Sequence, residues 1–170
     1  MSGSACRFSL AIAPLAFAAV AFIRPAVADN LLTTHRIPAA LANEAVGAAV
    51  ADCAAKGYFV TAVLVDSNGL RQAVLRGDNA GPHTLDGAQF KAFTSVTTKS
   101  DTGALAKRFE NAPIPNLFTR MPQFVVAQGA IVLKSGEEVI GGLGVSGAPG
   151  GEKDEACARA ALDKIKDRLQ

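Results

Sequence analysis

The stretch Gly141-Gly-Leu-Gly-Val-Ser-Gly-Ala-Pro-Gly-Gly-Glu-Lys-Asp-Glu155 joins a strand-like segment to a helix-like one through a glycine-dense turn. Six of its first eleven residues are glycine, which indicates close approach to the backbone or conformations that a Cβ atom resists. Three acids, Glu152, Asp154 and Glu155, stand at the expected start of the helix, where they complement the positive end of its dipole. The stretch predicts a strand–turn–helix corner near the C-terminus.

The glycines of this corner do not fit a nucleotide-binding loop. Such a loop follows a strand with G-x-G-x-x-G, and an acid lies about 20 residues further on. Here Gly141 and Gly142 fall inside the expected strand, and 15 residues follow Glu155. We interpret the small residues as letting a neighbouring element or a flat ligand lie against the sheet. Glu152 and Glu155 fit either a weakly bound cation or the helix dipole alone.

Apolar spacing, turn residues and proline positions predict the other elements. These are a helix over 38–57, hairpin strands over 58–65 and 70–76, a helix over 84–98 with Thr84 as N-cap, a shorter helix from Ser100 or Asp101 to about 111, a strand pair or bent strand over 124–133, a strand over 139–145 and a helix over 153–169. Antiparallel hairpins with helices packed on a face predict one α+β domain of the profilin-like kind.

Residues 1–28 have the features of a cleaved secretory signal peptide. Arg7 supplies a basic start, residues 8–23 form an apolar run, and Ala26-Val-Ala28 has the form of a cleavage site. A membrane anchor is the alternative, although this run is shorter than the about 20 residues that span a bilayer. We therefore expect a single mature domain over residues 29–170, located in the periplasm or secreted.

Charge and cysteine content narrow the partners of the expected mature domain. Cleavage would remove Arg7 and Arg24 from the 17 basic residues and none of the 15 acids. The resulting net charge of about zero gives no support for nucleic acid or an anionic membrane as a partner. Cys53 and Cys157 remain after loss of Cys6. They fit a disulfide in an oxidising compartment and two buried thiols equally well.

His83 is the candidate with the most direct chemistry. It lies between a loop and an expected helix start, where a neutral imidazole can ligate iron or carry a proton. The alternative is a histidine that is hydrogen-bonded to the loop backbone. The other histidine, His35, lies in the lead-in to the first helix. The sequence shows no recognisable nucleophile turn for a catalytic triad, so no catalytic residue is assigned.

Several motifs occur together, in order, over nearly the whole expected mature domain. They are Cys53-x-x-x-Gly57-Tyr58, Val65-Asp66-x-x-Gly69, Leu75-Arg-Gly-Asp78, Ala80-Gly-Pro-His-Thr84, Lys91-Ala-Phe-Thr94 and residues 142–158. The set resembles the GlcG/HbpS-like family of small domains, which are related to the C-terminal haem-binding domain of PduO-type proteins. The glycine turn that runs into the acidic helix start is the most specific of these motifs.

The resemblance implies a five-stranded antiparallel sheet flanked by helices and assembly into a homo-oligomer. It also implies haem as the cofactor, with haem binding or haem-linked redox sensing as the activity, and an unclear role beside glycolate or diol catabolism. Carried over onto the matching motifs, His83 would ligate the iron, and Arg76 or Lys91 would pair with the haem propionates. Thr94 would complete the cofactor-binding set on the same helix.

One turn departs from the family pattern. Family members usually carry Gly-Gly-x-Pro-Ile where this chain has Ala127-Gln-Gly-Ala-Ile131, and Phe118-Thr-Arg-Met121 replaces a more apolar, glycine-containing approach. If this turn lines the ligand site, the pocket of this protein is altered.

Three hypotheses about function follow. The first is an exported protein that binds or senses a small molecule, with haem as the expected ligand. The second is a non-catalytic accessory or structural subunit of a periplasmic oxidation system, with a larger protein as partner. The third is an enzyme of small hydroxy-acid catabolism, which needs a catalytic constellation that the sequence does not show.

Overall fold

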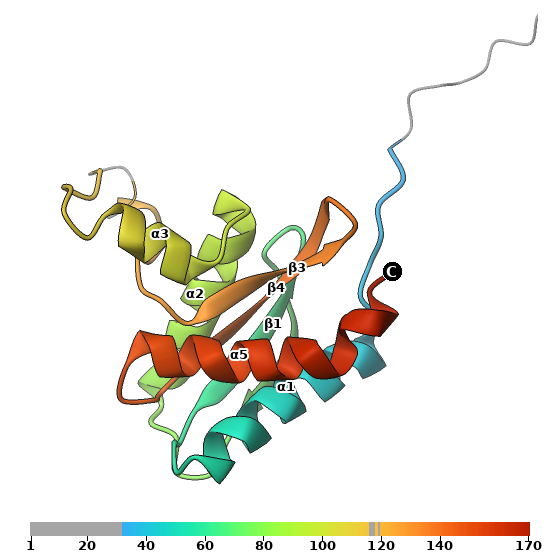
Figure 1. Ribbon diagram of the computed structural model, residues 1–170, viewed down its shortest axis with the longest axis horizontal. Coiled ribbons are helices and arrows are strands. Elements are labelled where there is room, and N and C mark those ends of the chain that lie inside the picture. Colours follow the sequence, from blue (N-terminus) through green and yellow to red (C-terminus); the bar gives the residue numbers. More distant parts are fainter. Residues whose placement is uncertain (1–31, 116–117, 119) are drawn as a thin grey trace, which may run out of the picture. The chain divides into compact units, whose positions relative to one another are not determined.

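The structure is a computed structural model that describes residues 32–115, 118 and 120–170. The expected signal peptide over residues 1–28 lies outside the described residues. Residues Thr33–Gln170 form one compact unit, whose elements are labelled in Figure 1. Within the described residues, no helix is both long and apolar enough to pass through a bilayer.

Four antiparallel strands form the sheet of this unit, in the order β2-β1-β4-β3. They are β1 (Thr61–Asp66), β2 (Arg71–Arg76), β3 (Ala130–Ser135) and β4 (Glu138–Ser146). The hairpin of β1 and β2 turns at Asn68-Gly69, as the sequence predicts, and Gly69 has a φ of +79°. The α+β class is therefore confirmed.

The sheet of the described residues has four strands, and the expectation of five was wrong. The expected strand or strand pair over 124–133 yields β3 alone, since residues 124–128 have no regular structure. The backbone amide of Val125 donates to Oγ1 of Thr94 at 2.9 Å instead of joining a strand ladder. Gly129, with a φ of +135°, turns the chain before β3 begins.

Helices α1 (Ala39–Ala55) and α5 (Gly151–Ile165) lie side by side on one face of the sheet, as Figure 1 shows. Their apolar side chains form the larger core cluster with the strands that they cover. Gly57, with a φ of +78°, follows the end of α1 as predicted. Cys53 and Cys157 are fully buried and form a disulfide between the two helices, with Cα atoms 5.6 Å apart.

Helix α2 (His83–Thr98) covers the opposite face of the sheet, over β1 and β4. Gly144 of β4 allows this close approach. A Cβ atom at Gly144 would collide with the carbonyl oxygen of Ala88 and would lie 2.8 Å from the amide nitrogen of Ala92. The glycines of β4 thus let a neighbouring helix lie against the sheet, which is one of the two possibilities that the sequence offered.

The start of α2 differs from the sequence prediction. The helix begins at His83 and Pro82 precedes it, so Thr84 is not the N-cap. The buried hydroxyl of Thr84 donates to the carbonyl oxygen of Gly81 and lies 2.6 Å from the hydroxyl of Thr61 on β1. The hydroxyl of Thr84, which the sequence predicts to cap the helix, therefore contacts Thr61 of a distant strand. No local sequence pattern reveals this contact.

Helix α3 (Thr102–Arg108) follows α2, and a short 3-10 helix, η1 (Lys166–Arg168), follows α5. Asp101 precedes α3, but its carboxylate accepts the amide of Val132 on β3 and does not cap the helix. The hydroxyl of Thr102 exchanges hydrogen bonds with the backbone of Ala130. These side chains bond to the β3 edge of the sheet, and β2 is the edge strand on its other side.

Candidate functional site

Two of the site residues that the sequence predicts lie where α2 begins beside β2. Thr61 of β1 links the two elements: it pairs with Arg76 in the sheet, and its hydroxyl contacts the second residue of α2. His83, the first residue of α2, therefore lies near the end of β2 that carries Arg76. The Nε atom of Arg76 donates to the carbonyl oxygen of Ala80 at 2.7 Å. We call His83, Arg76 and the loop over 77–82 the β2–α2 corner.

The imidazole of His83 is exposed and lies against Gly81. A Cβ atom at Gly81 would be 2.7 Å from Cε1 and 2.9 Å from Nδ1 of the ring, but 3.8 Å from Nε2. Nε2 is therefore the ring nitrogen further from Gly81. An exposed imidazole nitrogen can ligate a metal.

Lys91 lies on the buried side of α2. Its Nζ atom donates to Oδ2 of Asp154 at 2.7 Å and to the carbonyl oxygen of Val145 at 3.2 Å. The other carboxylate oxygen of Asp154 accepts the amide of Ala148 at 2.9 Å. Burial raises the pKa of the Asp154 carboxyl above its ordinary value of 3.8, against the opposing effect of Lys91. This ion pair joins α2 to the end of β4 and the start of α5.

Thr94 is also buried, and its hydroxyl accepts the amide of Val125, as described above. At 1.5 Å per residue, Lys91 and Thr94 lie about 12 and 16.5 Å from His83 along the helix axis. The structure thus brings His83 and Arg76 to one exposed corner and places Lys91 and Thr94 in the interior. The roles predicted for these four residues stay predictions.

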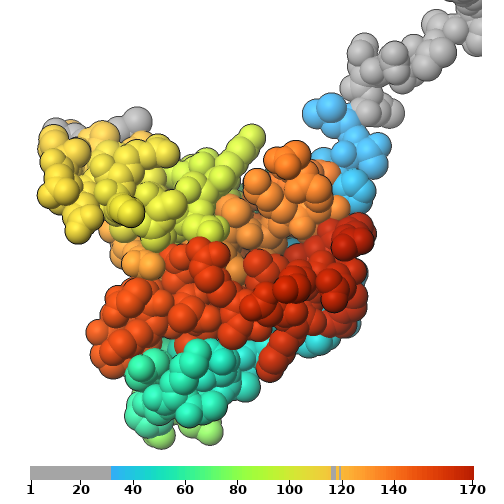
Figure 2. Space-filling view, in the orientation of Figure 1, coloured from blue at the N-terminus to red at the C-terminus, as the bar shows by residue number. Residues whose placement is uncertain are grey.

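A second feature is a recess of about 580 Å³ between α3 and the start of α5. Its volume falls in the range of small-molecule sites. Figure 2 shows α3 in yellow and α5 in red on the face that carries it. The recess is lined by Gly103, Ala104, Ala106, Lys107, Glu110, Gln128 and Glu155. Because Gln128 belongs to the turn that departs from the family pattern, a ligand in this recess would meet the altered turn, and a ligand at the β2–α2 corner would not.

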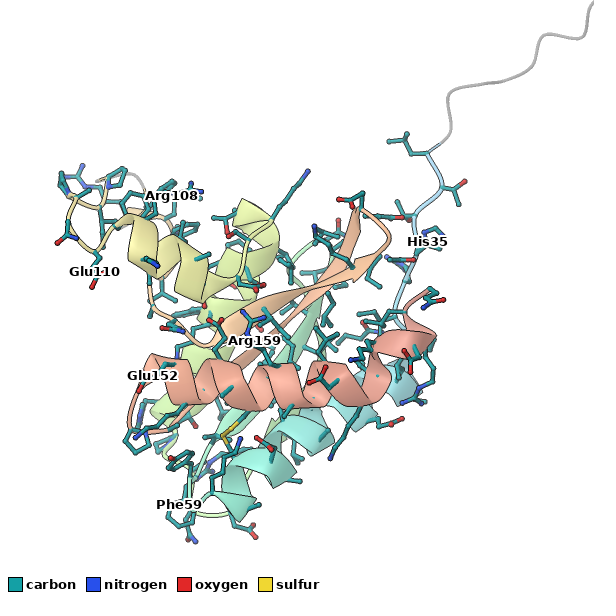
Figure 3. All side chains as sticks on the ribbon, viewed as in Figure 1. His35, Phe59, Arg108, Glu110, Glu152 and Arg159 are labelled. Carbon is teal, nitrogen blue, oxygen red and sulfur yellow. A yellow bond between two sulfur atoms is a disulfide. The ribbon has the colours of Figure 1, made fainter. Side chains whose placement is uncertain are left out.

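The acids at the start of α5 serve different purposes. Glu152 is exposed at the beginning of the helix (Figure 3). Glu155 is buried, and its two oxygens accept the amide of Gly103 at 2.9 Å and Nη2 of Arg159 at 2.6 Å. Nη2 of Arg159 also donates a hydrogen bond to Oδ2 of Asp101 at 2.8 Å. Glu155 is thus committed to α3 and to Arg159, so the idea that it only complements the helix dipole is wrong.

Sequence reasoning missed the structural roles of Asp154 and Asp101. The local sequence predicts that Asp154 is an exposed acid at a helix start and that Asp101 caps a helix. It gives no sign that Lys91 packs on Asp154, or that strand β3 packs on Asp101. The glycine turn over 147–151 was the one available signal. Its small residues let backbone amides approach the carboxylate of Asp154.

Within the described residues, no group of three or more His, Cys, Asp or Glu side chains converges as a metal site would require.

The fold and this corner define a small α+β domain with helices on both faces of an antiparallel sheet. The model of the HbpS-like family, described as haem degrading protein HbpS-like, matches residues 37–163. The chain therefore belongs to the HbpS-like family, and the resemblance seen in the sequence is confirmed.

Solved structures agree with this assignment. The crystal structure of HbpS is 34% identical over 80% of this chain and 94% of that one, with a TM-score of 0.74. A double mutant of HbpS from Streptomyces reticuli is 34% identical over 91% and 98%, with a TM-score of 0.75. The complex of PduOC with haem is 26% identical over 77% and 96%, with a TM-score of 0.70. Comparison with curated proteins gives no match.

Proposed function

We propose that this protein is an exported haem-binding or haem-sensing protein. The observation that carries the proposal is that two exposed residues, His83 and Arg76, lie at one corner of a chain that belongs to the HbpS-like family. The similarity to PduOC, whose structure is that of a haem complex, supports the same ligand.

The residues of the β2–α2 corner fit a haem group. Haem iron needs only one or two axial ligands from a protein, so a single histidine such as His83 suffices where no cluster of metal ligands converges. Arginine binds carboxylates such as the haem propionates with charge-assisted hydrogen bonds. We assign this role to Arg76 ahead of Lys91, because Asp154 already holds the ammonium of Lys91. The role of Lys91 and Thr94 is then to fix α2, the helix that presents His83.

Titration with hemin tests this function. Purified protein is expected to give a saturable Soret band at micromolar hemin, and His83→Ala is expected to shift or weaken it. His35→Ala is the matched control, because His35 is the other histidine and is held by Glu138 at 2.6 Å. No saturable band with the wild-type protein, or equal effects of the two substitutions, would contradict the assignment. Bleaching of the band with time would indicate degradation instead of storage or sensing.

Export is the second component of the proposal. It rests on the signal-like sequence over residues 1–28 and is supported by the disulfide between Cys53 and Cys157, since disulfides persist in oxidising compartments. Intact mass of the protein from the periplasm or culture medium is expected to correspond to a chain that starts at Asp29. A full-length chain that stays in the cytoplasm would argue against export.

An accessory subunit remains the second candidate, because Gln128 of the altered turn lines the 580 Å³ recess. If that recess is the family's ligand site, the change at this turn favours assembly over ligand binding. This candidate predicts co-purification with a larger protein and no response to hemin. We also propose a homo-oligomer, which light scattering coupled to size-exclusion chromatography measures directly.

A further inference from the structure

The edge strand β2 has one face that helix α2 covers only in part. Helix α2 packs mainly over β1 and β4, and it touches β2 where Gln89 accepts a hydrogen bond from Arg71. Residues that pair across β1 and β2 point to the same face of the sheet. Val63 and Val65 of β1 belong to the cluster under α2, and their partners on β2 are Val74 and Arg71. Val74 and Arg71 therefore point to the face of the sheet on which α2 lies, and both are exposed at the margin of that helix.

A register shift gathers two arginines on this face. Residues five apart on a regular strand point to opposite faces. Here Val65 pairs with Arg71 while Leu64 pairs with Ala73, which leaves one extra residue in β2. Arg71 and Arg76 consequently share the face of Val74. We call Arg71, Val74 and Arg76 the β2 strip.

The β2 strip combines two cations with an apolar centre. Val74 is 42% exposed although it is a large hydrophobic residue, and the side chain of Arg71 is 55% exposed. The Nε atom of Arg71 donates to Oε1 of Gln89 at 3.0 Å, which holds the guanidinium in place. Asp86 is the acid beside it, with Oδ1 4.0 Å from Nη2 of Arg71. The strip ends at Arg76, in the β2–α2 corner.

We propose that the β2 strip recognises the carboxylates and the apolar ring of a tetrapyrrole, with Arg71 and Arg76 as the two carboxylate anchors and Val74 as the apolar contact. The inference rests on the proposed function and deepens it, because it assigns recognition of the organic ring to residues other than the iron ligand. A flat apolar body with two carboxylates complements an apolar residue flanked by two arginines. Metal-free porphyrins of the same kind should therefore bind as well.

Fluorescence titration with metal-free protoporphyrin IX and with its dimethyl ester tests the inference in the full-length protein. Arg71→Gln and Arg76→Gln are each expected to weaken protoporphyrin binding roughly fivefold, since half-exposed ion pairs are screened by water. The ester lacks the carboxylates, so its affinity should not respond to either substitution. Arg108→Gln is the matched control, because Arg108 is an exposed arginine at the end of α3 (Figure 3).

A gain of affinity provides a second measurement that does not depend on damage to the protein. Asp86→Asn removes the acid beside Arg71, so protoporphyrin should bind about two- to threefold more tightly. If wild-type protein binds hemin and protoporphyrin but neither arginine matters more than Arg108, the inference is overturned and the proposed function stands. If neither hemin nor protoporphyrin binds, both are overturned.

Discussion

Lys91 of α2 and Asp154 of α5 form a buried ion pair, with 2.7 Å between Nζ and Oδ2 and both side chains at most 10% exposed. The pair joins the two helices at the end of the sheet that they share, and the carbonyl of Val145 and the amide of Ala148 complete its hydrogen bonds. The sequence predicts that Lys91 contacts a ligand, but in the fold this lysine holds two helices together.

Loss of Lys91 should destabilise the protein strongly. Lys91→Met leaves the carboxylate of Asp154 buried without a cation beside it, which costs about 3–5 kcal/mol in comparable cases. Urea denaturation measures the change in the free energy of unfolding. Lys107→Met, at an exposed lysine of α3, should change it by less than about 0.5 kcal/mol. Combining Lys91→Met with Asp154→Leu should cost less than Lys91→Met alone. Equal stability of the two lysine variants would contradict the buried pair.

The pH dependence of stability should reveal the raised pKa of Asp154. A carboxyl whose pKa is higher in the folded than in the unfolded chain contributes stability that is present below the unfolded pKa. That contribution is lost as the pH rises through the folded pKa, which here lies above 3.8. The stability of the wild type relative to Asp154→Asn should therefore fall as the pH rises from about 3 through the folded pKa. A relative stability that rises over this interval would mean that Lys91 outweighs burial.

The disulfide should contribute substantially to stability, because it closes a loop of 104 residues. The chain-entropy estimate for a loop of this length is about 4–5 kcal/mol. The double variant Cys53→Ala with Cys157→Ala should unfold at lower denaturant than the oxidised wild type, and reductant should affect only the wild type. Two titratable thiols in denatured, unreduced wild-type protein would show that the disulfide does not form.

The close approach of α2 to β4 should make Gly144 intolerant of a side chain. In Gly144→Ala the added methyl group meets the backbone of Ala88 and Ala92, so helix and sheet must separate. We expect a loss of about 1–3 kcal/mol or more. Gly47→Ala is the matched control: Gly47 lies inside α1 with nothing within 4 Å of the added atom. It should stabilise the protein by about 0.5–1 kcal/mol, because alanine favours helix. Thermal unfolding distinguishes the two.

Features set by backbone conformation over a few residues could be predicted from the sequence. Gly57 and Gly69 occupy positive-φ positions at the end of α1 and in the β1–β2 turn, and glycine adopts such conformations without the strain of a Cβ atom. The exposed placement of His83 and Arg76 also agrees with a loop and a strand edge. The strand expected over 124–128 was wrong because Thr94, distant in sequence, takes the Val125 amide that a strand would use.

The sequence alone determined the family, the α+β class and the order of most elements, because glycine turns and apolar periodicity act through neighbouring residues. The tertiary structure decided which polar residues are buried against a partner and which are exposed. The sequence predicts a ligand contact for Lys91 and a helix start for Asp154 and Glu155, but packing buries each against a partner 4 to 63 positions away. The same packing leaves Arg71 and Arg76 exposed on one face of β2. Burial and pairing depend on the distance between elements in space, which no local pattern records.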